Sequence, residues 1–378
     1  MTRAVCTKLP STTKPHKQPT KLTSRDDMTQ AQHALLIGDF APLHLGHMQD
    51  INHAAQMATT LHIIITPPKA NPLPSGRCPT LADVARWVQN ACQQFGFVRV
   101  HTIASLGLDK LNNLCNFDYQ TAHTPPAELP ALCQALQLDT SDIVIITKAK
   151  QGNLPTDTTN ASTANLAQLP STIVDNLPIA TQPLSHFAKL SPACRYFYTQ
   201  TVCIVGGESS GKTTLVHKLA NHYGASVALE MGRLYTHSHL GGSELALQYS
   251  DYTPIAIHHA KAIEHACHNA TAAITLIDTD FATTQAFCET YENASNPVVA
   301  SLALDYRMDF TLYLDNNVAW VADGMRRLGG AARSQFAQKL LEILARYRID
   351  YHGIDNPDYH QRYLQAVAWI DRQILAKF

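Results

Sequence analysis

The sequence predicts an α/β protein with two parallel-sheet domains, and two observations lead to this prediction. Short apolar runs alternate with amphipathic stretches along most of the chain, which is typical of parallel sheets covered by helices. In each half, a glycine-containing segment joins an apolar run to an amphipathic stretch, at residues 38–47 and 206–213. We expect a tail at residues 1–32, one domain at 33–198 and a second at 199–378.

The first half contains alternating strand and helix patterns. Thr80 and Asp83 have the spacing of a capping box, which marks a helix start. We expect strands at 34–37, 61–66, 98–103 and 142–147, and helices at 48–60 and 80–95. The periodic signal fades from residue 148 to 201, and the polar stretch 152–171 is expected to be a flexible loop or an inter-domain segment.

The second half repeats the alternation. We expect strands at 201–205, 226–230, 274–277, 311–314 and 350–354. Helices are expected at 215–223, 243–269, 332–346 and 359–377, the second of them broken at Pro254. These elements complete a second parallel sheet.

The composition restricts the class of protein. The chain has 378 residues, of which 45% are hydrophobic and 16% charged, as in soluble globular proteins. A net charge of −1 gives no reason to expect nucleic acid or a membrane as partner, and no apolar run approaches the roughly 20 residues of a membrane span. The nine cysteines form no C-x-x-C pair, which favours a reducing cytoplasm. The oligomeric state stays open, a homo-oligomer included.

A phosphate-binding loop follows the strand at 201–205. The motif needs glycine, four residues, glycine, lysine and threonine between a strand and a helix, and this pattern is met by Gly206, Gly207, Glu208, Ser209, Ser210, Gly211, Lys212 and Thr213. Backbone N–H groups of such a loop surround a phosphate, Lys212 reaches the β and γ oxygens, and Thr213 offers its hydroxyl to Mg²⁺. We predict ATP and Mg²⁺ as cofactors, bound by residues 206 to Thr214.

A second phosphate-handling pattern is the pair His44 and His47, flanked by Gly38, Phe40, Pro42 and Gly46. Two imidazoles at a strand-to-helix corner can donate hydrogen bonds to a triphosphate, and Gly46 leaves room for the base. The pattern resembles the nucleotidyltransferase signature of the cytidylyltransferase-like fold, with both histidines catalytic and with Gly38, Phe40 and Gly46 at the nucleotide. A cation site completed by His53, or a purely structural pair, is the alternative.

The second half resembles the bifunctional NadR-type family, which joins a nicotinamide mononucleotide adenylyltransferase to a ribosylnicotinamide kinase. The matching runs are residues 206–213, 230–233, 241–242, 246–252, 277–281, 283–288 and 320–324, with Arg326. The first half matches the family through residues 38–47 and 79–81, with Arg86 and Trp87. The resemblance implies a nucleotidyltransferase-like domain at 33–198 and a P-loop kinase domain at 199–378.

The resemblance also implies roles for single residues. Lys212, Glu230, Asp280 and Arg326 would be catalytic, Glu230 by accepting the proton of the attacking hydroxyl and Arg326 from a lid. Thr213 and Asp278 would hold Mg²⁺, with Asp280 as a further candidate. The implied substrate-binding residues are Glu230, Arg233, Tyr249, Asp280, Trp320 and Asp323. Solvated acids, surface arginines and core aromatic residues are the alternatives.

The first half departs from the family in two places. A Gly-Trp-Asp-x-Trp run is replaced by residues 107–110, which contain no tryptophan. A helix start with serine and arginine for the triphosphate is replaced by residues 177–183, and the next arginine is Arg195. Without that arginine, a departing pyrophosphate lacks one positive charge.

The function implied by the resemblance is ATP-dependent phosphorylation of nicotinamide riboside to the mononucleotide in NAD salvage. The partners would be small molecules: nicotinamide riboside, the mononucleotide and ATP. The first domain either also transfers an adenylyl group to give NAD or only senses a nucleotide, and a kinase for another nucleoside is the remaining alternative. Enteric members of the family carry a helix-turn-helix that polar residues 1–32 do not supply, so we expect no operator binding.

Overall fold

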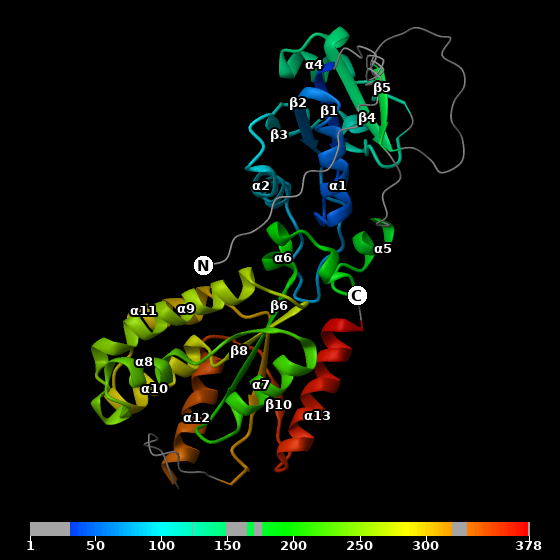
Figure 1. Cartoon of the computed structure of the whole chain (residues 1–378). Helices are drawn as coiled ribbons and strands as arrows, with labels where there is room; N and C mark the ends of the chain where they lie inside the picture. Colours follow the sequence, from blue (N-terminus) through cyan, green and yellow to red (C-terminus); the bar gives the residue numbers. More distant parts are fainter. Residues whose placement is uncertain (1–30, 123, 149–164, 170–175, 320–330, 377–378) are drawn as a thin grey trace, which may run out of the picture. The chain divides into compact units, whose positions relative to one another are not determined.

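The computed structural model describes residues 31–122, 124–148, 165–169, 176–319 and 331–376 (Figure 1). These residues form two five-stranded, all-parallel sheets, which confirms the predicted fold class. No helix in these ranges is both long and apolar enough to cross a membrane.

The first sheet has the strand order β3-β2-β1-β4-β5, with β1 in the centre. Its strands are β1 (Ala31–Gly38), β2 (Ala58–Ile65), β3 (Val98–Thr102), β4 (Ile143–Lys148) and β5 (Asn165–Leu169). Leu35 and Ile37 pack into one hydrophobic cluster, while Ala34 and Leu36 pack into another, so β1 is buried on both faces. A strand buried on both faces explains the continuous apolar run in the sequence.

Among the described residues of the first half, two helices lie close to the predicted places, and four short ones were not predicted. They are α1 (Leu45–Ala54), α2 (Leu81–Cys92), α3 (Asn112–Cys115), α4 (Leu129–Leu136), α5 (Asn176–Thr181) and α6 (Pro192–Tyr198), with 3₁₀ turns at Thr140–Asp142 and Phe187–Lys189. Thr80 and Asp83 form the predicted capping box.

Three predictions for the first half are wrong. The helix expected to reach residue 60 ends at Ala54, because the residues from Ala58 join β2 and pair with β1. Residues 31 and 32, assigned to the tail, belong to β1. The stretch 152–171 contains β5, a short edge strand whose apolar residues are interrupted by Gln168 and form no continuous run.

The second sheet has the order β10-β9-β6-β8-β7, with β6 in the centre. Its strands are β6 (Gln200–Gly206), β7 (Ser226–Ala228), β8 (Ile274–Asp278), β9 (Phe310–Leu314) and β10 (His352–Ile354). The helices of this half are α7 (Lys212–Tyr223), α8 (Met231–His239), α9 (Tyr252–His268), α10 (Phe281–Glu292), α11 (Pro297–Asp305), α12 (Ala331–Arg346) and α13 (Tyr359–Ile370), the last continuing as a π turn at Asp371–Leu375.

The helix expected at 243–269 is shorter. Its first part forms two 3₁₀ turns, Glu244–Ala246 and Tyr249–Asp251. Pro254 does not break α9 but lies in its first turn, where a missing N–H costs no helical hydrogen bond. Likewise β7 ends before Glu230, which occupies the N-cap position of α8.

Candidate active sites

The phosphate-binding loop leaves the central strand β6 and enters α7. Gly206 and Gly211 have φ angles of 151° and 89°, and a Cβ atom on either would lie 2.5 Å from the Leu314 carbonyl oxygen or 2.6 Å from the Tyr359 ring. Only glycine fits both positions. Lys212 is 8% exposed, and its ammonium donates to the carbonyls of Gly206 and Gly207 at 3.0 and 3.1 Å. Lys212 therefore lies against the loop, and its role at a phosphate stays a prediction.

Two buried arginines that sequence reasoning missed hold the outer side of this loop. Arg333 Nε donates to the carbonyl of Glu208 at 2.9 Å, and Arg362 Nη1 donates to that of Ser210 at 2.9 Å. Arg362 also donates to the Asp315 carbonyl at 2.9 Å, and it is only 1% exposed. These bonds satisfy two of the loop's carbonyls from behind and hold the loop in shape.

The residues predicted to hold Mg²⁺ lie together. The Thr213 hydroxyl donates to Asp278 Oδ2 at 2.6 Å, and Asp278 is 1% exposed at the end of β8. Burial, and then the charge of Glu230, raises the pKa of the Asp278 carboxyl. Asp278 Oδ1 has no hydrogen-bond partner among the described residues. A buried carboxylate with an unused oxygen beside a hydroxyl is a donor set that fits Mg²⁺.

Asp280, the other predicted acid, lies differently. It is the N-cap of α10, and its Oδ1 accepts hydrogen bonds from the Thr283 backbone and hydroxyl at 2.7 and 2.6 Å. It borders a separate hollow with Tyr306 and Arg307, and neither hollow beside the phosphate-binding loop includes it. Helix capping accounts for its buried carboxylate without a substrate or metal.

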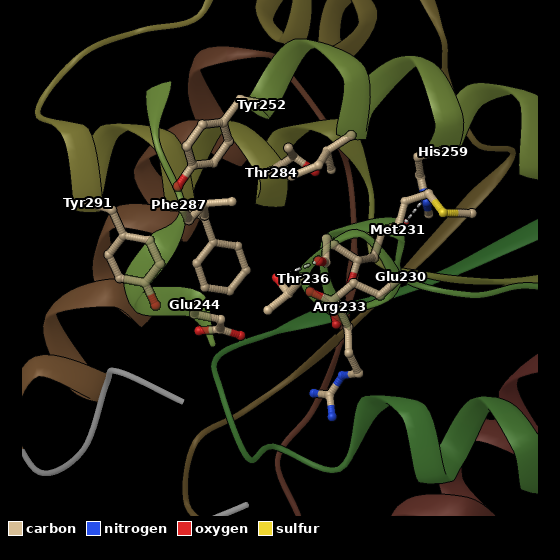
Figure 2. A pocket seen from close by; sticks show the side chains of 14 residues that line it. Glu230, Met231, Arg233, Thr236, Glu244, Tyr252, His259, Thr284, Phe287 and Tyr291 are labelled. Atoms are coloured by element: carbon tan, nitrogen blue, oxygen red, sulfur yellow. Dashed lines mark hydrogen bonds between the residues drawn. The ribbon is translucent and has the colours of Figure 1, made fainter. Parts of the chain in front are cut away.

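A pocket of about 540 Å³ lies beside the phosphate-binding loop (Figure 2). We call it the aromatic pocket, because Phe287, Tyr252 and Tyr291 form much of its wall together with Glu230, Arg233, Thr236, Glu244 and His259. Glu230, Arg233, Glu244 and Phe287 also line the hollow of about 480 Å³ at the loop itself. The two spaces therefore adjoin each other at these four side chains.

The aromatic pocket contains two of the predicted substrate residues, Glu230 and Arg233. Tyr249 lies outside it: this side chain is 40% exposed and donates to the Ser295 carbonyl at 3.0 Å, because its 3₁₀ turn directs it to the surface. Tyr252, three residues on, lines the pocket instead. Trp320, Asp323 and Arg326 lie outside the described residues.

In the first half, the predicted residues meet where β1 leads into α1. His44 is the N-cap of α1, and its Nδ1 accepts the His47 N–H at 3.2 Å. The two rings stack with centroids 3.6 Å apart, and Phe40 contacts His47 edge-on at 5.2 Å. Burial, and then the charge of Lys148, lowers the pKa of His44 to about 3, and burial also lowers that of His47. Both imidazoles are therefore neutral hydrogen-bonding groups at pH 7.

Three neighbours of this pair escaped sequence reasoning. Asp50, fully buried on α1, accepts the Tyr119 hydroxyl at 2.8 Å and the Lys148 ammonium at 3.4 Å. Asp50 follows His47 by three residues, a helical spacing that could have revealed it, but Tyr119 and Lys148 arrive from distant segments. Among the residues in the described ranges, no three His, Cys, Asp or Glu side chains are grouped so as to hold a metal ion.

These features define a P-loop nucleotide-binding α/β domain preceded by a second parallel α/β domain with an H-x-x-H corner. A family model described as an AAA domain matches residues 201–362. The chain is 34% identical over 358 residues to the trifunctional NAD biosynthesis/regulator protein NadR of Escherichia coli K12, covering 89% of this chain and 82% of that protein. The Salmonella typhimurium LT2 protein of the same name is 33% identical over the same length.

Two solved structures share the fold. A NadR protein in complex with NR has a TM-score of 0.66 at 20% identity, covering 91% of this chain and 96% of the other. A NadR protein in complex with NAD and AMP-PNP has a TM-score of 0.64 at 18% identity. The identity and coverage of the curated relatives show that this chain belongs to the NadR family.

Proposed function

We propose that the second domain phosphorylates nicotinamide riboside, transferring the γ-phosphoryl group of ATP to the 5′-hydroxyl to give the mononucleotide and ADP. The observation that carries this proposal is the position of the aromatic pocket. It shares four lining side chains with the hollow at the phosphate-binding loop. The curated relatives are named as proteins of NAD biosynthesis, and a solved NadR structure holds NR, which supports the same substrate.

The chemistry of the aromatic pocket suits a cationic ring. Phe287, Tyr252 and Tyr291 supply aromatic surfaces, and Glu230 and Glu244 add two carboxylates to the same wall. Aromatic faces and carboxylates both attract positive charge, and the pyridinium ring of nicotinamide riboside carries one. A neutral purine or pyrimidine would gain the stacking but not the charge attraction.

The residues where the aromatic pocket meets the hollow at the phosphate-binding loop have different roles in the proposed reaction. Glu230 lines both spaces, so its carboxylate can accept the proton of the 5′-hydroxyl as that oxygen attacks phosphorus. Lys212 and the loop amides stabilise the charge that builds on the transferred group. Thr213 and Asp278 would hold Mg²⁺, which when bound neutralises charge on the β- and γ-phosphates. Phe287 helps to exclude water from the junction.

A competition assay tests the substrate. Purified protein receives ATP, Mg²⁺ and equal amounts of nicotinamide riboside, nicotinic acid riboside, uridine and adenosine, and products are counted by mass spectrometry. We expect the nicotinamide mononucleotide to dominate. Glu244→Gln should reduce the preference for the cationic riboside several-fold, since a rim charge contributes about 0.5–1 kcal/mol. Preference for a neutral nucleoside would contradict the proposal.

We further propose that the first domain transfers the adenylyl group of ATP to the mononucleotide, releasing pyrophosphate and forming NAD. The specific observation in favour is Lys148, whose ammonium lies 3.4 Å from Asp50. Burial is the main cause that lowers the pKa of both His44 and His47, and the charge of Lys148 adds to it. A cation therefore exists at this corner although the arginine expected from the family is missing. The histidines would donate hydrogen bonds to the triphosphate while Lys148 offsets the charge of the leaving group.

Lys148→Met distinguishes transfer from sensing. The wild type, given mononucleotide, ATP and Mg²⁺, should release NAD and pyrophosphate in equal amounts, and Lys148→Met should do so about 10- to 100-fold more slowly. Lys110→Met, a surface lysine of the same domain, is the matched control and should behave as wild type. Tight nucleotide binding without any NAD would instead favour a sensing domain.

A further inference from the structure

An unusual backbone conformation separates the two acids that follow β8. Thr279, between Asp278 and Asp280, has a φ of 77°, in the left-handed region, and is 3% exposed. A β-branched residue rarely adopts this conformation, because its side chain crowds the backbone. Thr279 therefore stays in this conformation only because its surroundings hold it there.

Two hydrogen bonds hold Thr279 from opposite sides. Its N–H donates to the Ile204 carbonyl of the central strand β6 at 3.1 Å. Its own carbonyl lies 3.0 Å from Nε2 of His259. Because a carbonyl only accepts, His259 must carry its proton on Nε2 and donate it.

The side chain of His259 is itself held in place, because it is buried and packs against a neighbouring helix. It lies on α9, 2% exposed, between Ile255 and Ile263 on the buried side of the helix. Its ring meets Phe281, the first residue of α10, edge to face at 5.6 Å. Figure 2 shows it at the wall of the aromatic pocket. Burial lowers its pKa, so the neutral ring keeps one fixed tautomer near pH 7.

We propose that His259 is a positioning residue of the kinase site: it holds Thr279 in the left-handed conformation so that Asp278 faces Thr213. Loss of this donor leaves a buried carbonyl unpaired and frees Thr279 to return to negative φ, which rotates the backbone next to Asp278. The 2.6 Å contact between Thr213 and Asp278 would then be lost. This inference rests on the proposed kinase function only for its activity readout.

The test compares three variants of α9. His259→Leu removes the donor, whereas His259→Gln keeps an amide N–H close to the Nε2 position. His258→Leu, an exposed histidine beside it, is the matched control. The readouts are kcat, KM for riboside, melting temperature, and affinity for a fluorescent ATP analogue with and without Mg²⁺. The metal-free affinity reports the loop alone, and the Mg²⁺-dependent part reports Asp278.

We expect His259→Leu to lower kcat and the Mg²⁺-dependent part of analogue affinity about 10- to 100-fold, the usual effect of losing a group that orients a metal ligand. Metal-free affinity should stay within about twofold, since the phosphate-binding loop itself is unchanged. His259→Gln should recover most of the loss. If His259→Leu does not fold, His259→Asn, whose amide is too short to reach Thr279, must show the same loss.

The variant Thr279→Gly tests whether His259 acts through the conformation of Thr279. Glycine adopts positive φ readily, so in Thr279→Gly the hydrogen bond from His259 is not needed to hold the conformation. Adding His259→Leu to this variant should therefore lower kcat and the Mg²⁺-dependent affinity about tenfold less than it does in the wild type. Three results would overturn the inference. The first is that His259→Leu lowers activity equally with and without Thr279→Gly, and the second is that it folds and keeps the wild-type dependence of binding on Mg²⁺. The third is a metal-free affinity that falls as much as the Mg²⁺-dependent one. If the wild type phosphorylates no riboside while Mg²⁺-dependent binding still requires His259, the proposed function fails and the inference stands.

Discussion

The corners that follow the central strands of the two sheets, β1 into α1 and β6 into α7, occupy the same topological position but present different groups to a phosphate. In the second sheet the groups are backbone N–H groups and one ammonium, Lys212. In the first sheet they are two stacked neutral imidazoles, His44 and His47, with Lys148 nearby. Parallel α/β sheets place ligands at this position whatever the side chains are.

The groups at each corner fit the reaction that we propose for it. Phosphoryl transfer gathers charge on a terminal phosphate, which a ring of amides and a fixed cation can surround. Adenylyl transfer places the reacting phosphorus in the middle of the polyphosphate chain, where two hydrogen-bond donors and a cation can stabilise a departing pyrophosphate. The backbone loop needs glycine at Gly206 and Gly211, whereas the imidazole corner needs particular side chains.

The largest expected effect comes from Lys212→Ala. Phosphorylation of riboside should fall at least about 10²- to 10³-fold, because a charge that stabilises the transition state is removed. NAD formation from added mononucleotide should stay unchanged, since the imidazole corner is untouched. A coupled assay for ADP and NAD measures both reactions on one preparation. An active, folded Lys212→Ala protein would remove the loop from the mechanism.

The reciprocal change is His47→Ala. We expect NAD formation to fall roughly 10²-fold or more, the usual effect of losing a hydrogen-bond donor at a reacting phosphate, with riboside phosphorylation unchanged. His53→Ala, one and a half turns further along α1, is the control. If His47→Ala made NAD at the wild-type rate, the two corners would not divide the reactions as described.

A smaller effect is expected behind the phosphate-binding loop. Arg362→Met leaves several buried carbonyls without a donor, so the free energy of unfolding should fall by about 2–4 kcal/mol. Arg362→Lys should recover only part of this, because one ammonium cannot reach carbonyls on separate segments. Urea unfolding measures the change, with the exposed Arg372→Met as control. Wild-type stability of Arg362→Met would show that the loop needs no support from this side.

The smallest effect concerns acid stability of the first sheet. His33, His62 and His101 lie side by side on β1, β2 and β3, with ring nitrogens 3.1 and 3.3 Å apart. Burial, and then the charge of His101, lowers the pKa of His62 to about 4, below its usual 6.5. The folded state thus favours the neutral ring, and this stabilisation is complete above about pH 6.5 and is lost as the pH falls toward 4.

The expected size is about 1–2 kcal/mol over that range, reduced because solvent reaches part of the cluster. Thermal unfolding between pH 7 and pH 4 measures it. His62→Gln should flatten the pH dependence, whereas His360→Gln, an exposed histidine of α13, should not. An unchanged slope in His62→Gln would assign the acid sensitivity to other groups.

The local patterns could be predicted from the sequence. The phosphate-binding loop, the H-x-x-H corner and nine of the ten strands are encoded in short runs of adjacent residues. The aromatic pocket could not be found this way. Tyr252 and Phe287 come from different helices, and only the packing of α9 against α10 brings them together. The same holds for Arg333 and Arg362, which reach the loop from residues more than 100 positions away.

The positions of single predicted site residues also depend on where a turn or strand ends, which the sequence pattern does not show. Tyr249 and Tyr252 stand in one motif, but the end of a 3₁₀ turn decides which of them faces the pocket. Asp280 is a further candidate for Mg²⁺ beside Asp278 in the sequence, yet β8 ends at Asp278 and Thr279 turns the chain through its left-handed φ. Alternation along a strand predicts a shared face only while the strand continues.

The most direct measurement follows the γ-phosphorus of labelled ATP. Purified protein is incubated with nicotinamide riboside, Mg²⁺ and ATP labelled at the γ position, and the products are separated. The account predicts that the label appears in the nicotinamide mononucleotide, one phosphate for each ADP formed, and that Lys212→Ala transfers none. Riboside recovered without label, while the protein remains folded and the ATP remains intact, would contradict it.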